Sequence, residues 1–341
     1  IDFGPEDISK RASSLLDHAL ELLSRHIFDG VIIGPQGRVY RDVIYPFKQS
    51  AQAFVHFMNK ELPTVIGTSG AECMWLAVLA TSKYKLPIHL NQTMGKEIEC
   101  IYTSDEAKIH LKKTKDYILT SVESPREDYI PEKKADPKLF STPWVKEMNI
   151  KYHGKTRFEP GVYGYQQHMW YAALAKDCPI FANHPGVSTD DVQMRPGYWY
   201  GNGVFPALKQ KGNILAAIYC IGEDHPIHFT HLYWPTHNFD EMCQKNKWIF
   251  GKKGNGYVGV WCSELMVPYS DVLIDREYRA YGNTTAYVCQ CGSKEEHNTF
   301  EEFQQSCLKK SITFDEHTSH LIVAEEFDMT FLAVRDETQY I

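Results

Sequence analysis

The sequence predicts an α+β protein in which a helical N-terminal part precedes a large antiparallel β-domain. In residues 5–86, apolar residues recur at the three- and four-residue spacing of amphipathic helices. From about Ile98 onward, short apolar and β-branched segments are separated by turn residues, and few helical segments lie between them. This pattern favours antiparallel sheets over alternating β-α-β units. We therefore expect a helical portion over residues 1–95 and one antiparallel β-sandwich domain over residues 96–341.

The helical portion is expected to contain three helices. The first begins near Glu6 and ends near Phe28, and the next two cover residues 50–60 and 71–84. The third is nearly apolar all round, which predicts that it is packed between other helices. Three helices are too few to form a closed helical domain of any size. They must pack on the rest of this chain, on a further N-terminal helical portion, or on a partner chain.

The strands of the β-domain are predicted from runs of apolar, β-branched and aromatic residues. Lys252-Lys253-Gly254-Asn255-Gly256 stands between two such runs and predicts a tight hairpin. The expected strands cover residues 117–122, 214–221, 228–234, 248–250, 257–261, 285–289, 320–324 and 329–334.

Composition excludes several classes of function. The chain has 341 residues, a net charge of −7 and no basic stripe, so nucleic-acid binding is not expected. A mean hydropathy of −0.38 and the lack of a long apolar run argue against a membrane protein.

The nine cysteines show no disulfide or zinc spacing, and Cys289 and Cys291 are expected to be buried thiols on one strand face. Free thiols favour a reducing compartment, so a cytoplasmic location is expected. Because the chain opens with Ile1, a periplasmic or secreted location stays open.

The segment over residues 181–203 is the most informative part of the chain. It gathers imidazole, guanidinium, amide and aromatic side chains between glycines and prolines, which predicts a loop. Such side chains together are typical of a site that holds and acts on a sugar ring. The alternative is a packed aromatic turn in which His184 bonds to a backbone carbonyl. The candidate residues are His184, Arg195, Tyr198, Trp199 and Asn202.

Other segments offer side chains that could line the same cleft. Trp199 and Trp234 are candidate stacking platforms for a sugar. His225, His228 and His231 are spaced by three residues, which suits a metal site on a helix. On a strand, His228 and His231 point to opposite faces, which disfavours a shared metal. The further candidates for substrate binding are Arg38, Tyr40, Gln166, His168, His231 and Trp234.

Several motifs together resemble a known family. They are Gly-Tyr-Gln-Gln-His-Met-Trp over residues 164–170, Asn-His-Pro-Gly over 183–186, Arg-Pro-x-Tyr-Trp-x-Gly-Asn-Gly over 195–203, and Phe-Thr-His over 229–231 before Trp234-Pro235. The chain resembles the C-terminal part of heparinase II/III-like polysaccharide lyases and their uncharacterised bacterial relatives. The resemblance implies the end of an α/α toroid over residues 1–95, followed by an antiparallel β-sandwich. A toroid needs many more helices than the sequence shows. The resemblance therefore implies a piece of a longer enzyme, a truncated toroid, or a site completed by a partner chain or homo-oligomer.

The resemblance also implies an activity, which is β-elimination on a poly- or oligosaccharide that contains uronic acid. His184 is the expected base for the C5 proton, and Tyr198 is the expected acid. Arg195 and Asn202 would neutralise the substrate carboxylate, with Arg38 and Tyr40 on the opposite wall of the cleft. No cofactor is expected. Some related lyases hold a structural zinc or calcium ion in the β-domain, so the resemblance implies such an ion as the second possibility.

Two other functions fit the same residue types. A glycoside hydrolase would need two carboxylates across the cleft, for which Asp190 or Asp191 with Glu72 are the candidates. A non-catalytic carbohydrate-binding or assembly subunit is favoured if the catalytic groups lie in helices outside this chain.

Overall fold

The computed structural model describes residues 14–33, 93–123, 170–185, 204–269 and 276–331, apart from scattered positions within these ranges. All statements below concern these residues.

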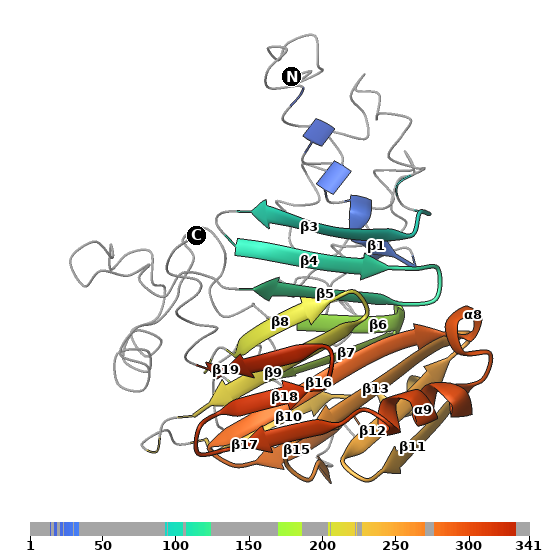
Figure 1. The fold of residues 1–341 in the computed structure, drawn as a ribbon. Coiled ribbons are helices and arrows are strands. Elements are labelled where there is room, and N and C mark those ends of the chain that lie inside the picture. Colours follow the sequence, from blue (N-terminus) through green and yellow to red (C-terminus); the bar gives the residue numbers. More distant parts are fainter. Residues whose placement is uncertain are drawn as a thin grey trace, which may run out of the picture.

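Two antiparallel sheets form the body of the protein (Figure 1). The first has eight strands in the order β14-β15-β10-β7-β6-β5-β4-β3, and the second has six in the order β11-β12-β13-β16-β9-β8. The first sheet contains β3 (Ile98–Ser104), β4 (Ala107–Lys113), β5 (Ile118–Glu123), β6 (Trp170–Ala175), β7 (Cys178–Asn183), β10 (Phe229–Tyr233), β14 (Val267–Tyr269) and β15 (Glu277–Tyr281). The second contains β8 (Ala207–Lys211), β9 (Ile214–Cys220), β11 (Glu241–Lys245), β12 (Trp248–Lys253), β13 (Gly256–Cys262) and β16 (Thr284–Ser293).

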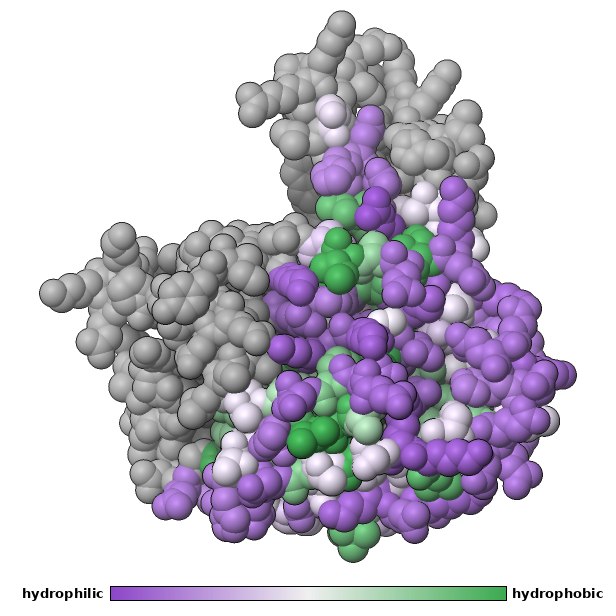
Figure 2. All heavy atoms as spheres, in the orientation of Figure 1, coloured by the Kyte–Doolittle hydropathy of each residue, from purple (hydrophilic) through white to green (hydrophobic). Residues whose placement is uncertain are grey.

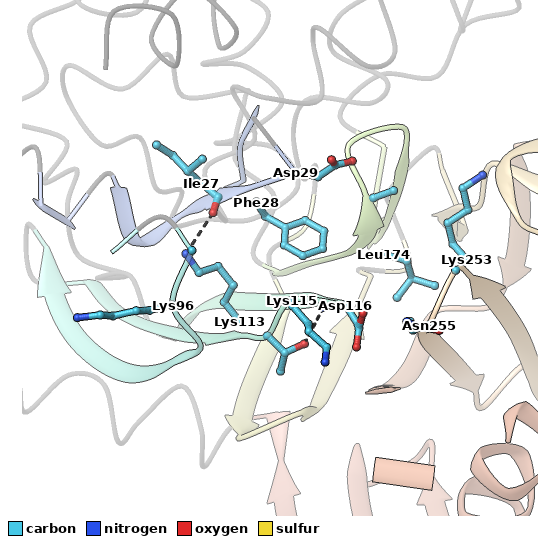
Figure 3. Close-up of a pocket in the computed structure, with 15 residues that line it drawn as sticks. Ile27, Phe28, Asp29, Lys96, Lys113, Lys115, Asp116, Leu174, Lys253 and Asn255 are labelled. Carbon is cyan, nitrogen blue, oxygen red and sulfur yellow. Dashed lines mark hydrogen bonds between the residues drawn. The ribbon is translucent and has the colours of Figure 1, made fainter. Parts of the chain in front are cut away.

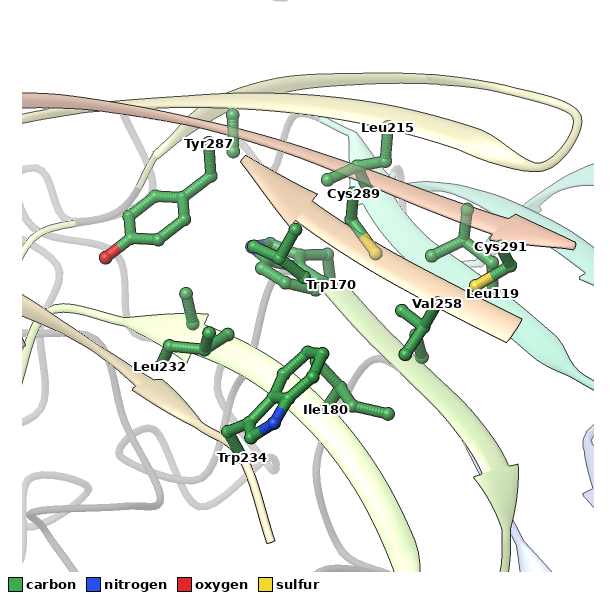
Figure 4. Close-up of a cluster of buried hydrophobic side chains, with 14 of the residues drawn as sticks. Leu119, Trp170, Ile180, Leu215, Leu232, Trp234, Val258, Tyr287, Cys289 and Cys291 are labelled. Carbon is green, nitrogen blue, oxygen red and sulfur yellow. The ribbon is translucent and has the colours of Figure 1, made fainter. Parts of the chain in front are cut away.

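The two sheets face each other across one apolar core. Trp170, Ile180 and Leu232 of the first sheet lie in the same buried cluster as Val258 and Cys289 of the second (Figure 4). Because side chains alternate along a strand, one face of each sheet supplies this core. The arrangement is an antiparallel β-sandwich, as expected from the sequence.

A second core covers the outer face of the six-stranded sheet. Helix α9 (Phe300–Leu308) and the three-stranded sheet of β17 (Ile312–Asp315), β18 (His320–Val323) and β19 (Phe327–Thr330) pack on that face. Helix α8 (Lys294–His297) links β16 to α9. Strands β9, β13 and β16 are therefore buried on both faces, which explains the nearly continuous apolar sequences of β9 and β13.

The predicted hairpin is confirmed. Strands β12 and β13 pair up to Lys253 and Gly256, so Gly254 and Asn255 form a two-residue loop. Gly254 has a φ of 58°, which glycine adopts without the steric cost that a side chain adds. A Cβ at Gly256 would collide with the backbone carbonyl oxygen of Asp116, so the hairpin depends on glycine at this position.

The prediction of α/α toroid helices is wrong for the described residues. The two α-helices whose ends are both described, α8 and α9, follow the sheets in the chain and pack on one of them. The described positions between Ser14 and Arg25 are helical, but this helix does not reach Phe28. Instead, β1 (Ile27–Phe28) pairs with β2 (Val31–Ile32). The other two expected helices lie outside the described residues.

Figure 2 shows that hydrophilic side chains dominate the described surface on that side of the molecule, with smaller apolar patches between them. Within the described ranges, no helix is long and apolar enough to cross a membrane.

Candidate functional site

Three of the site residues expected from the sequence lie in the described part of the chain: His184, His231 and Trp234. The others lie outside the described residues, and so do the carboxylates considered for a hydrolase. The undescribed site candidates are Arg38, Tyr40, Gln166, His168, Arg195, Tyr198, Trp199 and Asn202.

His231 lies on β10, and His184 directly follows the neighbouring strand β7. Strand β7 pairs antiparallel with β10, and Asn183 lies directly opposite His231. His184 follows Asn183 immediately. The expectation that residues 181–183 belong to a loop is wrong, because Phe181–Asn183 form the end of β7 and pair with β10.

His184 has a contact that suits an anchoring role. It is completely buried, and its Nε2 lies 3.0 Å from the carbonyl oxygen of Ile227. A carbonyl only accepts hydrogen bonds, so Nε2 must carry the hydrogen and donate it. His184 therefore ties the end of β7 to the segment that leads into β10. The alternative expected from the sequence was a packed turn in which His184 bonds to a backbone carbonyl, and this contact agrees with it.

His231 belongs to a buried polar cluster on the outer face of the eight-stranded sheet. Its Nδ1 lies 3.5 Å from Oε1 of Glu277, and Nε of Arg279 donates to the same oxygen at 2.8 Å. Residue alternation explains the shared face. His231 lies opposite both Asn183 and Arg279, whereas Leu232 and Ala280 point into the sandwich core.

Arg279 is held by two aromatic rings as well as by Glu277. Its guanidinium carbon lies 4.3 Å from the centroid of the Phe229 ring and 3.4 Å from that of Tyr269. Such cation–π contacts keep the planar guanidinium in one orientation. Arg279 is therefore a fixed positive charge beside Glu277.

The electrostatic balance keeps Glu277 ionised. Burial by itself raises the pKa of a carboxyl group, because the charged form loses hydration. His231 and Arg279 act in the opposite direction, and the net result is a pKa of Glu277 below its ordinary value. A buried carboxylate thus lies beside the His231 imidazole at neutral pH.

Stacked aromatic side chains continue this face of the sheet. The ring of Phe181 stacks on Tyr171 at 5.7 Å and on Tyr233 at 5.1 Å between centroids. All three are buried, so they form a rigid apolar row next to Asn183 and His231.

Trp234 lies on the opposite face, inside the sandwich core. It is completely buried and stacks on Phe239 with 4.6 Å between ring centroids. The structure thus corrects its interpretation as an open stacking platform, because its ring faces contact the core instead of solvent (Figure 4).

His228 and His231 have different surroundings. His228 is exposed and its Nδ1 lies 2.7 Å from Oδ1 of Asn283, whereas His231 is buried on the sheet. Among the residues that the structure describes, no group of three or more His, Cys, Asp or Glu side chains is placed to hold a metal ion.

A separate cavity of about 470 Å³ lies near β1, the β4–β5 turn and the β12–β13 hairpin (Figure 3). Its lining includes Lys96, Lys113, Lys115 and Lys253. Lys113 donates to the carbonyl oxygen of Ile27 at 3.1 Å, and Figure 3 shows the amino groups of Lys96 and Lys253 pointing in different directions. The charges do not converge on one point, so this cavity is the weaker candidate.

Comparison with protein-family models and with curated proteins gives no match for this chain. The case for a function therefore depends on the residues and their geometry. Glu277 and Arg279 are the members of the cluster that the sequence did not single out. Their i, i+2 spacing on a strand predicts a shared face, but the pairing that sets them beside His231 is not encoded locally.

Proposed function

We propose that this chain is a carbohydrate-active lyase that cleaves uronic-acid-containing poly- or oligosaccharides by β-elimination, with His231 as the base. The observation that carries the proposal is the buried cluster of His231, Glu277 and Arg279, with Asn183 opposite His231. The motifs that resemble heparinase II/III-like lyases give further support, since two of them contain Asn183 and His231.

The proposed reaction needs three kinds of group. A base removes the C5 proton, the C5–H electron pair forms the C4–C5 double bond, and the C4 oxygen leaves with its bonding pair and takes a proton from an acid. Donors must also neutralise the uronate carboxylate, because this makes the C5 proton more acidic. His231 supplies the imidazole, and Asn183 and Arg279 supply amide and guanidinium groups on the same face. Tyr198 stays the proposed acid from the sequence.

The role of base passes from His184 to His231 for a structural reason. The Nε2 of His184 is committed to the Ile227 carbonyl, whereas His231 has a carboxylate beside Nδ1. A carboxylate in that position is the usual way to orient a basic imidazole. Both histidines are buried in the structure, so a substrate reaches His231 only when this face of the sheet becomes exposed.

We also propose a reducing compartment, such as the bacterial cytoplasm. The cysteines of the described segments are free thiols. Cys289 and Cys291 are both buried on one face of β16, as the sequence predicts. Unbridged thiols of this kind are typical of proteins that stay in a reducing environment.

The test is the formation of an unsaturated product from uronic-acid polysaccharides, followed by ultraviolet absorbance. We expect turnover by the wild-type protein and a loss of roughly 10²–10⁴-fold in His231→Asn, the usual scale for a general base. Asparagine keeps an N–H where Nδ1 lies but lacks Nε2. The matched control is His320→Asn, which removes a half-exposed histidine from β18 and should leave turnover unchanged.

The outcomes separate the alternative functions. Release of reducing ends without an unsaturated product would indicate a hydrolase. Binding of the polysaccharide without cleavage would indicate a carbohydrate-binding or assembly subunit. Full activity in a folded His231→Asn protein would remove His231 from the mechanism.

A further inference from the structure

We infer that Glu277 is a positioning residue, whose carboxylate, held by Arg279, orients the His231 imidazole and stabilises the imidazolium that forms when His231 accepts a proton. The role in turnover rests on the proposed function, whereas the effect on the His231 ring can be measured without a substrate.

One oxygen atom makes both contacts. Oε1 of Glu277 lies 2.8 Å from Nε of Arg279 and 3.5 Å from Nδ1 of His231. A charged acceptor beside Nδ1 favours the tautomer with its hydrogen on Nδ1, which leaves Nε2 as the basic nitrogen. Glu277 would thus decide which of the two ring nitrogens takes the substrate proton.

The cluster is built to hold this geometry. Phe229 and Tyr269 enclose the guanidinium of Arg279, and Arg279 in turn holds Glu277. The side chains of His231 and Glu277 are 0% and 1% exposed, so their interaction is only weakly screened by water.

The described elements next to His231 present no second carboxylate to its ring. Strand β15 supplies Glu277 and Arg279, and the end of β7 supplies Asn183 and then His184. The closest outward-facing neighbours on β10 itself are Phe229 and Tyr233, and β14 contributes Tyr269. Glu277 is therefore the acidic group of the described residues that can act on His231.

The proton balance of the proposed step is simple. His231 Nε2 accepts the C5 proton and becomes imidazolium, while Glu277 stays a carboxylate throughout. After the product leaves, the imidazolium returns the proton to solvent. Glu277 lowers the free energy of the charged intermediate state and takes no proton itself.

The test uses Glu277→Gln in the full chain. Glutamine keeps the size of the side chain and an oxygen that can still accept from Arg279 and His231, but it removes the negative charge. Asp328→Asn is the control, because it neutralises an exposed carboxylate 2.6 Å from His320 Nε2 on the separate three-stranded sheet. Glu277→Asp, which draws the carboxylate back by one methylene, serves as the second variant should Glu277→Gln not fold.

Two readouts are compared at a series of pH values. The first is the NMR titration of the His231 ring, assigned with His231→Asn. The second is the rate of unsaturated-product formation. In Glu277→Gln we expect the His231 titration midpoint to move to lower pH by about one unit or more. The acid limb of the turnover profile should move with it, and turnover should fall about tenfold or more. Glu277→Asp should move both readouts in the same direction by less, and Asp328→Asn should move neither.

An unchanged His231 titration in folded Glu277→Gln, or in Glu277→Asp, overturns the inference. A wild-type His231 ring that stays neutral at every pH at which the protein is folded overturns it as well. If the wild-type protein forms no unsaturated product, the proposed function fails, and the NMR titration alone decides whether Glu277 positions His231.

Discussion

Replacement of His184 separates an anchoring histidine from a catalytic one. His184→Ala deletes the donor of the 3.0 Å hydrogen bond to the Ile227 carbonyl oxygen. Both residues are buried, so water cannot replace the lost donor. A buried acceptor left without its donor costs about 1–3 kcal/mol, and the lost side-chain volume adds to this cost. We therefore expect the free energy of unfolding to fall by about 2–4 kcal/mol.

The assay is urea denaturation followed by intrinsic fluorescence. An anchoring role predicts a lower midpoint with an unchanged m-value, because the surface exposed on unfolding stays the same. His184→Gln is the matched variant, since the glutamine amide can place an N–H near the position of Nε2. It should recover most of the lost stability and keep turnover. A stable His184→Gln protein that is as inactive as His231→Asn would refute this reasoning and return the role of base to His184.

Three further predictions follow from the described residues. Gly256→Ala should lower stability by about 1–3 kcal/mol in urea denaturation, because its Cβ meets the Asp116 carbonyl, whereas Gly95→Ala meets no atom within 4 Å and should be close to neutral. Trp234→Ala should cost about 3–5 kcal/mol by the same assay, and a change in sugar affinity without that loss would contradict its place in the core. Burial lowers the pKa of His26 from 6.5 to about 4, so the folded state resists protonation of this ring. Its contribution to stability is complete above pH 6.5 and is lost as the pH falls towards 4, and His26→Gln should flatten that part of a stability–pH curve.

Local patterns in the sequence predicted the antiparallel β-rich character of the domain and six of the fourteen strands of its two large sheets, namely β5, β9, β10, β12, β13 and β16. The hairpin of β12 and β13 carries turn chemistry at Gly254 and Asn255, and β9 carries a continuous apolar run that marks a strand covered on both faces. Such signals depend on neighbouring residues alone, so they can be recognised without knowledge of the tertiary structure.

Helices were predicted less well, for two different reasons. A three- and four-residue apolar period indicates an amphipathic helix, but it does not specify how many helices pack together. The toroid was expected from the family resemblance and not from this period. Helix α9 was missed although its sequence holds a start signal. The Thr299 hydroxyl accepts from the backbone N–H of Glu302, and Glu301 and Glu302 lie in the first turn.

The candidate site depended on contacts that no local pattern encodes. His184 and His231 were singled out by residue type, but their different roles come from their contacts with Ile227 and Glu277. Ile227 lies 43 positions from His184 in the sequence, and Glu277 lies on a different strand from His231. Phe181–Asn183 were assigned to a loop because of the glycines and prolines that follow, and pairing with β10 overrides that signal. Strand register decides which side chains meet, and it is set by the whole sheet.

The most direct test of the central claim is the mass of the products formed from a uronic-acid oligosaccharide by the wild-type protein and by His231→Asn. Elimination predicts two products whose masses add up to that of the substrate, with the double bond in one of them, and it predicts that His231→Asn forms neither at a comparable rate. Products whose masses together exceed that of the substrate by one water would show hydrolysis and would contradict the assignment as a lyase.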